Sequence, residues 1–395
     1  MRITIVNGFF LPVPPVSGGS TEKSWYNLAR EFAARGHDVT MISRRWRSFP
    51  NEETSEGIRH LRLPGWDHQS QLLRNLLLDF WWSWRVFFAL PEADIVVVNA
   101  VALPMWLGWL RPRAGKIVIM TGRMPKGQYR RYRRIARVLA ASSFVRDKVL
   151  EENPALAPVT RVCGYPIDWR LLNHESDTAP PYLREIRSDE TTLGFVGRIH
   201  EEKGLMLLAD AARIIEQTPG LPPWRLLLCG PSDISHGGSG ASFRGRLLHR
   251  LSQAMHSSRF NLLDPQFNER TLAGVYRRIN IFCYPSLAEK GETFGVAVAE
   301  AMAAGAVPVV SRLDCFADFV HDGRNGLVFD HTAPDAAAQL AGALVRLLRD
   351  PELHRRLSAA ARQDARAYDY PVYAESLLAD FAQLTASPKP ASSSP

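Results

Sequence analysis

Short runs of β-branched and other apolar residues alternate with segments of helical periodicity along most of this 395-residue sequence. The alternation is typical of parallel β-sheets with helices on both faces, because parallel strands need crossover connections. Single hydrophobic cores rarely extend beyond about 250–300 residues. The sequence therefore predicts an α/β fold with two doubly wound, Rossmann-like domains.

The predicted strands fall into two groups. The first group lies at residues 3–6, 39–42, 95–98, 117–120 and 138–141, and the second at 192–196, 225–229, 281–284 and 307–310. Polar, proline-containing sequence separates them. We expect a first domain at 1–175, a linker at 176–191, a second domain at 192–368, a C-terminal helix at 369–385 and a disordered tail at 386–395, which is rich in Pro, Ala and Ser.

The formal charge of +8 and the pI near 9.5 indicate an anionic partner. No zinc-finger spacing or RNA-recognition signature accompanies the basic residues, so we do not expect a nucleic-acid partner. The four cysteines, at 163, 229, 283 and 315, are too far apart for a local zinc site or a disulfide framework. We expect them to be reduced and buried.

Membrane spans and leader peptides also leave recognisable patterns. The most apolar stretch, residues 72–90, is interrupted by Arg74, Asp79 and Arg85, so it does not predict a transmembrane helix. The chain begins without the charged and long apolar regions of a secretory leader. We therefore expect a cytoplasmic location.

The segment from Glu292 to Val310 reads ETFGVAVAEAMAAGAVPVV and links a loop to a helix and a strand. Gly295 is expected at the helix N-terminus, where free amides and the helix dipole favour an anion such as a diphosphate. Glu292 precedes this helix and Glu300 lies within it, and carboxylates bind vicinal hydroxyls well. Taken alone, both glutamates are also consistent with ordinary helix carboxylates.

Two further glycine-containing loops follow predicted strands. The segment GFVGRIHEEKG from Gly194 to Gly204 carries Arg198 and Lys203 after a strand, at the edge where open parallel sheets bind ligands. These cations can neutralise a diphosphate, although a solvated loop is the alternative. Gly18 and Gly19 follow the first strand and precede a helix, and they allow either close backbone approach to a ligand or a simple turn.

Together these segments resemble the glycosyltransferase family 4 signature, over almost the whole chain. The resemblance implies a GT-B fold, in which two Rossmann-like domains face each other across a cleft, and a retaining reaction that needs no metal ion or other cofactor. The donor is then a nucleotide-diphosphate sugar, with UDP or GDP, and the acceptor is a sugar, a lipid-linked molecule or a small molecule. The first domain is implied to lie on the acceptor side.

The resemblance also assigns roles. The predicted catalytic residues are Arg198, Lys203 and Glu292. The predicted donor-binding residues are Gly18, Gly19, Gly197, Gly230, Gln266, Phe294, Gly295, Val296 and Glu300, with main-chain amides near residues 294–296 facing the donor. Many relatives carry a histidine after the fourth strand, where this chain has Thr121 and Arg123. Either these two residues replace the histidine or activity is weaker.

Two surface segments leave alternatives open. We interpret residues 123–137 as a solvated cationic helix on which Arg130, Arg134 and Arg137 share a face, and the alternative is a site for an anionic acceptor or an acidic membrane. We interpret residues 72–88 as a core-packing helix, and the alternative places its tryptophans at a lipid interface. The second alternative would make the protein peripheral at the inner face of the membrane.

Other activities share this architecture, because fold does not fix function. A sugar-nucleotide epimerase or hydrolase, and a non-catalytic nucleotide-sugar sensor, are the rival hypotheses. The Glu292–Gly305 segment favours a transferase over an epimerase or hydrolase, and the missing histidine leaves the sensor as an alternative.

Overall fold

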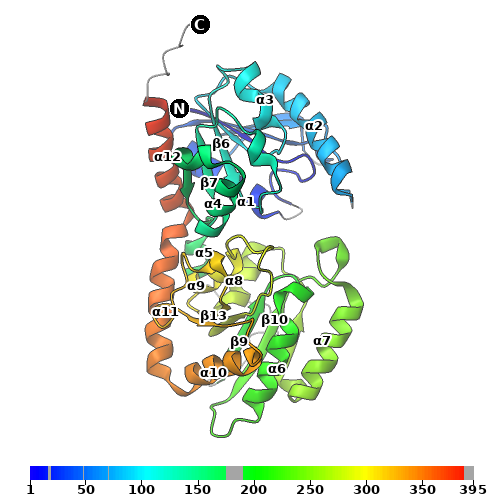
Figure 1. The fold of residues 1–395 in the computed structure, drawn as a ribbon, viewed down its shortest axis with the longest axis vertical. Coiled ribbons are helices and arrows are strands. Elements are labelled where there is room, and N and C mark those ends of the chain that lie inside the picture. Colours follow the sequence, from blue (N-terminus) through cyan, green and yellow to red (C-terminus); the bar gives the residue numbers. More distant parts are fainter. Residues whose placement is uncertain (17–18, 48, 70, 175–189, 387–395) are drawn as a thin grey trace. The chain divides into compact units, whose positions relative to one another are not determined.

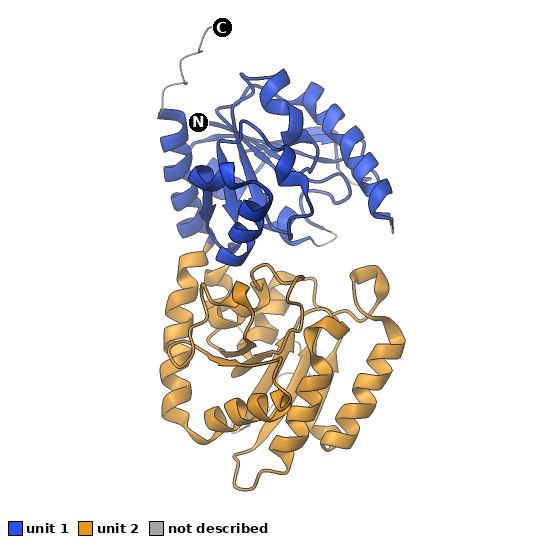
Figure 2. Cartoon of the chain, viewed as in Figure 1, with its two compact units in different colours: residues 1–166, 370–395 blue, residues 167–369 orange. Residues whose placement is uncertain are grey.

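We analysed a computed structural model of the chain, which describes residues 1–16, 19–47, 49–69, 71–174 and 190–386. The chain divides into two compact units, coloured separately in Figure 2: unit 1 contains residues 1–166 and 370–395, and unit 2 contains residues 167–369. Residues 387–395 of the predicted tail, and all of the predicted linker except its last two residues, lie outside the described residues, and Ala386 is the last residue of the C-terminal helix.

Unit 1 contains an eight-stranded sheet in the order β3-β4-β2-β1-β5-β6-β7-β8. Only the β3–β4 pairing is antiparallel among the described strands. The strands are β1 (Arg2–Val6), β2 (Asp38–Arg44), β3 (Glu52–Ser55), β4 (Ile58–Leu63), β5 (Ile95–Val98), β6 (Lys116–Thr121), β7 (Arg137–Ala140) and β8 (Thr160–Val162). The helices are α1 (Ser20–Ala34), α2 (Leu72–Ala89), α3 (Leu103–Leu110), α4 (Ser143–Glu152) and α12 (Tyr370–Ala386).

Two hydrophobic cores cover the two faces of this sheet. One contains Trp25 and Phe32 of α1 with Phe381 of α12, and the rings of Phe32 and Phe381 lie 6.1 Å apart. The other contains Trp82 of α2 and Leu107 of α3. Figure 1 shows α12 and α2 on opposite sides of unit 1. The alternation of strands and helices in the sequence thus corresponds to a sheet with helices packed on both faces.

Unit 2 contains a parallel six-stranded sheet in the order β11-β10-β9-β12-β13-β14. The strands are β9 (Thr191–Val196), β10 (Trp224–Cys229), β11 (Phe260–Leu263), β12 (Ile281–Tyr284), β13 (Val307–Ser311) and β14 (Leu327–Phe329). The helices are α5 (Trp169–Asn173), α6 (Leu205–Glu216), α7 (Gly240–Ala254), α8 (Glu269–Arg277), α9 (Val296–Ala303), α10 (Ala336–Arg349) and α11 (Pro351–Ala365). Helix α6 packs against α7 and α10, and α9 packs against α11.

All nine predicted strands are present, and the fold class predicted from the sequence is confirmed. The sequence reasoning missed β3, β4, β8, β11 and β14, which lie at or next to the sheet edges. A turn at Glu56 and Gly57, both with positive φ, joins β3 to β4. The buried face of β4 carries Ile58, His60 and Arg62, so its sequence lacks the alternation of apolar and polar residues that marks a half-buried strand.

The prediction of a cationic helix at residues 123–137 is wrong. Only a short 3-10 helix, η1 (Gln128–Arg131), forms there, and Arg134 has a positive φ of 54°. Arg137 is buried in β7, where its guanidinium donates two hydrogen bonds of 2.8 Å to Asp380 of α12. Because a strand begins at Arg137, the three arginines cannot share a helix face.

The interpretation of residues 72–88 as a core-packing helix is correct for one face only. Trp82 and Val86 of α2 are fully buried, whereas Trp81 and Phe88 are exposed. In the described part of the chain, no helix is both long and apolar enough to cross a membrane. The four cysteines are free thiols, three of them buried and Cys163 partly buried.

Candidate active site

The strand order of unit 2 brings the predicted donor-site residues to one edge of its sheet. The order reverses between β9 and β12, and open parallel sheets bind ligands beside the carboxyl ends of the strands at such a point. Arg198 follows β9, Gly230 follows β10 and Glu292 follows β12. Residues that are far apart in the sequence therefore meet at this edge.

The closest contact at this edge joins Lys203 to Glu292. The Lys203 Nζ donates a hydrogen bond of 2.7 Å to Oε2 of Glu292, and both side chains are about nine-tenths buried. Tyr284 and Ser286 also donate to Oε2, at 3.3 and 3.2 Å. Burial and the Glu292 carboxylate raise the pKa of Tyr284, so this hydroxyl stays protonated as a donor. The sequence predicted Lys203 and Glu292 but not that they bind each other.

Arg198 lies beside this pair on a more exposed loop. Its guanidinium donates hydrogen bonds of 2.8 Å to Oε1 of Glu202 and to the main-chain oxygen of Gly237. Sequence reasoning missed these two partners, because both contacts depend on loop conformation. Each of the two predicted phosphate-binding cations thus pairs with a carboxylate.

Helix α9 begins at Val296, directly after Gly295, whose φ is +88°. The ring of Phe294 is buried, 4.5 Å from that of Phe319, so this side chain belongs to the core and only its main chain is available to a ligand. Within α9, Glu300 accepts a hydrogen bond of 2.8 Å from Tyr276. Burial and the Glu300 carboxylate raise the pKa of Tyr276.

Two glycines at the ends of β9 and β10 pack closely together. The Gly197 amide donates to the Cys229 oxygen at 3.0 Å, and a Cβ added to Gly230 would lie 1.9 Å from the Gly197 oxygen. This spacing requires glycine at 230. Next to it, after β11, the Gln266 side chain donates to the Asp264 oxygen at 2.9 Å.

Unit 1 has a cavity of about 230 Å³ beside the carboxyl ends of β1, β5 and β6. This is the point where the strand order of unit 1 reverses, between β1 and β5. Both Thr121 and Arg123 line the cavity, as does Asn99 directly after β5. The Thr121 hydroxyl is buried and lies 2.6 Å from that of Tyr129, whereas Arg123 is exposed, with its guanidinium 5.9 Å from the Phe10 ring centre.

The glycine loop of unit 1 borders the same region. Gly18 lies outside the described residues, and Gly19 is the N-cap of α1. A Cβ on Gly19 would lie 2.4 Å from the carboxylate of Glu22, which lines the cavity. Burial raises the pKa of Glu22, and the nearby Arg123 lowers it. The sequence reasoning missed Glu22 because nothing in its helical position marks it as buried.

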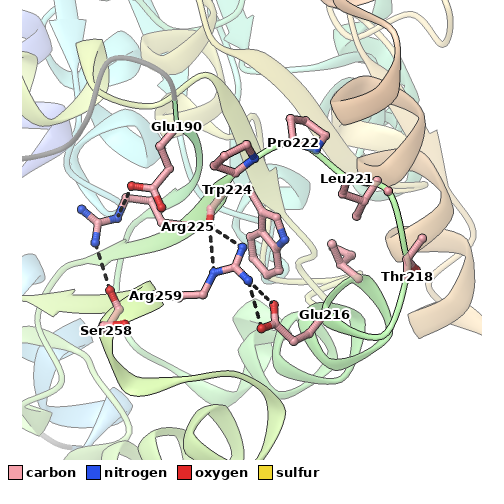
Figure 3. A pocket seen from close by; sticks show the side chains of 12 residues that line it. Glu190, Glu216, Thr218, Leu221, Pro222, Trp224, Arg225, Ser258 and Arg259 are labelled. Carbon is pink, nitrogen blue, oxygen red and sulfur yellow. Dashed lines mark hydrogen bonds and ion pairs between the residues drawn. The ribbon is translucent and has the colours of Figure 1, made fainter.

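A second cavity, of about 650 Å³, lies at the opposite end of β10 (Figure 3). Arg259 donates to both Glu216 oxygens at 2.8 and 2.9 Å, and Arg225 lies 3.6 Å from Glu190. Its charged residues thus neutralise one another, and none of the predicted site residues line it. The candidate active site is therefore the carboxyl edge of each sheet.

Comparison with known proteins identifies the family of this chain. The family described as "Glycosyl transferases group 1" matches residues 184–364, and "Glycosyltransferase Family 4" matches residues 18–162. A phosphatidyl-myo-inositol mannosyltransferase of Mycobacterium tuberculosis is 33% identical over 195 residues, 49% of this chain and 47% of the relative. A D-inositol 3-phosphate glycosyltransferase of Corynebacterium urealyticum is 33% identical over 200 residues, which are 50% of this chain and 44% of the relative. The matches thus span about half the length of these curated relatives.

Solved structures show the same architecture. Sucrose-phosphate synthase from Thermosynechococcus elongatus superposes with a TM-score of 0.77 at 23% identity, covering 98% of this chain and 99% of that one. Anabaena HepE, in complex with UDP and glucose, superposes with a TM-score of 0.70 at 15% identity, covering 97% of this chain and 100% of that one. The two family matches together cover most of the chain, so this chain belongs to the group 1, family 4 glycosyltransferases and has their GT-B fold.

Proposed function

We propose that this protein is a retaining glycosyltransferase that moves a sugar from a UDP- or GDP-sugar to a hydroxyl group of an acceptor, without a metal ion. Unit 2 binds the donor and unit 1 binds the acceptor. The observation that carries the proposal is the meeting of Lys203, Glu292 and Arg198 at the strand-order reversal of unit 2.

Arg198 and Lys203 bind the donor diphosphate in this proposal. Both cations are already held by carboxylates, Arg198 by Glu202 and Lys203 by Glu292. A diphosphate offers more negative charge than either carboxylate, and it competes for the same N–H donors. The N-terminus of α9, which begins after Gly295, adds unpaired amides and a positive dipole end.

The two glutamates bind the sugar and the ribose. Glu292 lies next to the phosphate-binding lysine, so we assign it to the transferred sugar. Glu300 lies one turn into α9, where Tyr276 orients its carboxylate, and we assign it to the ribose hydroxyls. The backbone at Gly197 and Gly230 and the Gln266 loop border the nucleotide.

The reaction breaks the bond between the anomeric carbon and the diphosphate oxygen. The acceptor hydroxyl then forms a new bond to that carbon on the same face, and its proton passes to the departing phosphate oxygen. Arg198, Lys203 and the α9 amides stabilise the charge that develops on the diphosphate. No strong protein base is needed, because the leaving group takes the proton.

The acceptor binds at the cavity of unit 1, beside Thr121 and Arg123. Among the relatives, one is named for a lipid, phosphatidyl-myo-inositol, and another for a soluble molecule, D-inositol 3-phosphate. The exposed face of α2 leads us to propose a peripheral position at the cytoplasmic face of a membrane.

The test is to incubate the purified protein with a panel of UDP- and GDP-sugars and hydroxylated acceptors. We expect a glycosylated product that keeps the anomeric configuration of the donor, measured by NMR. Release of nucleoside diphosphate without a glycosylated product would indicate a hydrolase, and donor binding without turnover would indicate a sensor. Either result would contradict the transferase proposal.

A further inference from the structure

The outer face of α2 and the end of α3 expose an unusual number of large apolar side chains. We call this surface the α2 apolar face, and it consists of Leu72, Leu73, Leu76, Leu77, Phe80, Trp81, Phe88, Trp109 and Leu110. Leu73 is 70% exposed, Trp81 60% and Phe88 78%. Exposed apolar residues without a binding role are normally scattered singly over a protein surface. A contiguous apolar surface of this kind therefore marks an interaction site.

The opposite side of α2 is packed into unit 1. Trp82 is fully buried, and its indole nitrogen donates a hydrogen bond of 3.1 Å to the Asn7 main-chain oxygen. The Trp84 and Trp106 rings stack 5.5 Å apart and join α2 to α3. The apolar face is therefore presented by an anchored helix, at the side of unit 1 away from α12 (Figure 1).

Positive charge borders the α2 apolar face at the end of α3. The chain contains no acidic residue between Asp94 and Asp147, whereas the exposed cations in this stretch are Arg113, Arg123, Lys126, Arg130, Arg131, Arg133 and Arg134. Arg134 lies 4.1 Å from the Trp109 ring centre and donates to the Gly108 oxygen at 3.2 Å, so the basic segment lies beside α3. The only acidic residue of α2, Asp79, is buried and accepts hydrogen bonds from two main-chain amides.

An apolar centre with tryptophans and a cationic rim matches the surface of an anionic lipid bilayer. A second copy of the chain fits less well, because a two-fold interface would bring the same arginines of both copies together. Charge complementarity thus favours a membrane as the occupant.

The α2 apolar face is continuous with the cavity of unit 1. Leu72 and Leu76 belong to both, and they line the cavity together with polar Glu22, Asn99 and Arg123. The carboxylate and the amide suit hydroxyl groups, and the guanidinium suits a phosphate. One surface therefore offers a polar end and an apolar end to a single molecule.

We infer that the acceptor is an amphiphilic membrane lipid, whose hydroxylated polar head enters the cavity of unit 1 while the α2 apolar face rests in an anionic bilayer. This inference rests on the proposed transferase function and names its acceptor class. The bilayer then supplies the acceptor directly to the cavity.

Vesicle flotation tests the docking. We expect the protein to float with phosphatidylcholine vesicles that contain phosphatidylglycerol, to float poorly with phosphatidylcholine alone, and to dissociate as salt is raised. The double variant Leu73→Glu/Trp81→Glu changes two exposed residues that do not line the cavity, and it should lose flotation at least tenfold. The matched control is Val372→Glu, at an exposed apolar position on α12, and it should float as the unchanged protein does.

Circular dichroism and the binding of UDP and GDP show whether the double variant stays folded. Failure of the unchanged protein to float at low salt would overturn the inference, as would equal flotation of the double variant. A dimer of the unchanged protein that the double variant abolishes would identify a second copy as the occupant and overturn it too.

Transfer assays test the acceptor class with matched pairs. Phosphatidylinositol and phosphatidylglycerol in vesicles are each compared with their deacylated head groups, with labelled UDP- and GDP-sugars. We expect label in the lipid, at least tenfold more than in the head group, and a raised KM for lipid in the double variant with donor binding unchanged. Equal transfer to head groups would overturn this inference and leave the transferase proposal intact. If no acceptor is glycosylated but the protein still floats with anionic vesicles, the transferase proposal and the acceptor class are both contradicted. Docking of the α2 apolar face on the membrane would still be supported.

Discussion

Lys203 and Glu292 lie 89 residues apart in the sequence and form a buried ion pair, with the Lys203 Nζ 2.7 Å from Oε2 of Glu292. In the proposed mechanism Lys203 stabilises the departing diphosphate. We expect Lys203→Met to lower kcat about 100- to 1,000-fold with a smaller effect on donor affinity, because the charge develops mainly in the transition state. Steady-state kinetics with saturating donor measures this.

The same pair also affects stability. Removal of one partner leaves a buried charge without its counterion and should cost about 3–5 kcal/mol in the free energy of unfolding. We expect the double variant Lys203→Met/Glu292→Gln to lose less than the sum of the two single variants, in urea titrations. Additive losses would show that the two groups do not interact in solution.

Glu300 is predicted to bind the ribose of the donor. Glu300→Ala should weaken the binding of UDP or GDP about 10- to 100-fold, because it removes a charged acceptor for two hydroxyl groups. Tyr276→Phe is the control, since it removes only the hydroxyl that orients Glu300, and it should have a smaller effect. Calorimetry provides both affinities, and unchanged affinity in Glu300→Ala would refute the assigned role.

Gly230 approaches Gly197 more closely than any side chain allows. An added Cβ would lie 1.9 Å from the Gly197 oxygen, so Gly230→Ala should displace the loops at the ends of β9 and β10 and weaken donor binding. Gly220→Ala is the matched control, because Gly220 also has a positive φ but has no atom within 4 Å of the added Cβ. Thermal unfolding with and without UDP or GDP distinguishes them: the control should lose only about 1 kcal/mol of stability and keep its response to nucleotide.

His60 makes stability depend on pH. Its ring is fully buried in β4, and burial lowers its pKa from 6.5 to about 4. Between these values the unfolded chain binds a proton that the folded protein does not, so the free energy of unfolding falls as pH falls from 6.5 to 4, by up to about 3 kcal/mol. Urea titrations across that pH range give the free energy of unfolding of the original protein and of His60→Phe, and the difference between the two values isolates the contribution of His60. A difference that does not vary with pH would contradict the prediction.

Local sequence determined the regular elements of this protein. The central strands at Ile3, Ile95 and Ile281 are short apolar runs buried on both faces, and this pattern depends only on neighbouring residues. The same holds for the start of α9 after Gly295, where a positive φ favours glycine. The family signature then identified Arg198, Lys203, Glu292 and Glu300 as a group before any contact was known.

Tertiary structure decided what these residues contact. Arg137 was expected on an exposed helix face, but it is buried in a strand because Asp380, 243 residues away, neutralises it. Trp81 and Trp82 are adjacent in the sequence, yet one is exposed and the other buried, because α3 and the sheet cover only one side of α2. Whether such a side chain is buried depends on charges and surfaces that are distant in the sequence and meet only in the folded chain. Local periodicity cannot predict these contacts.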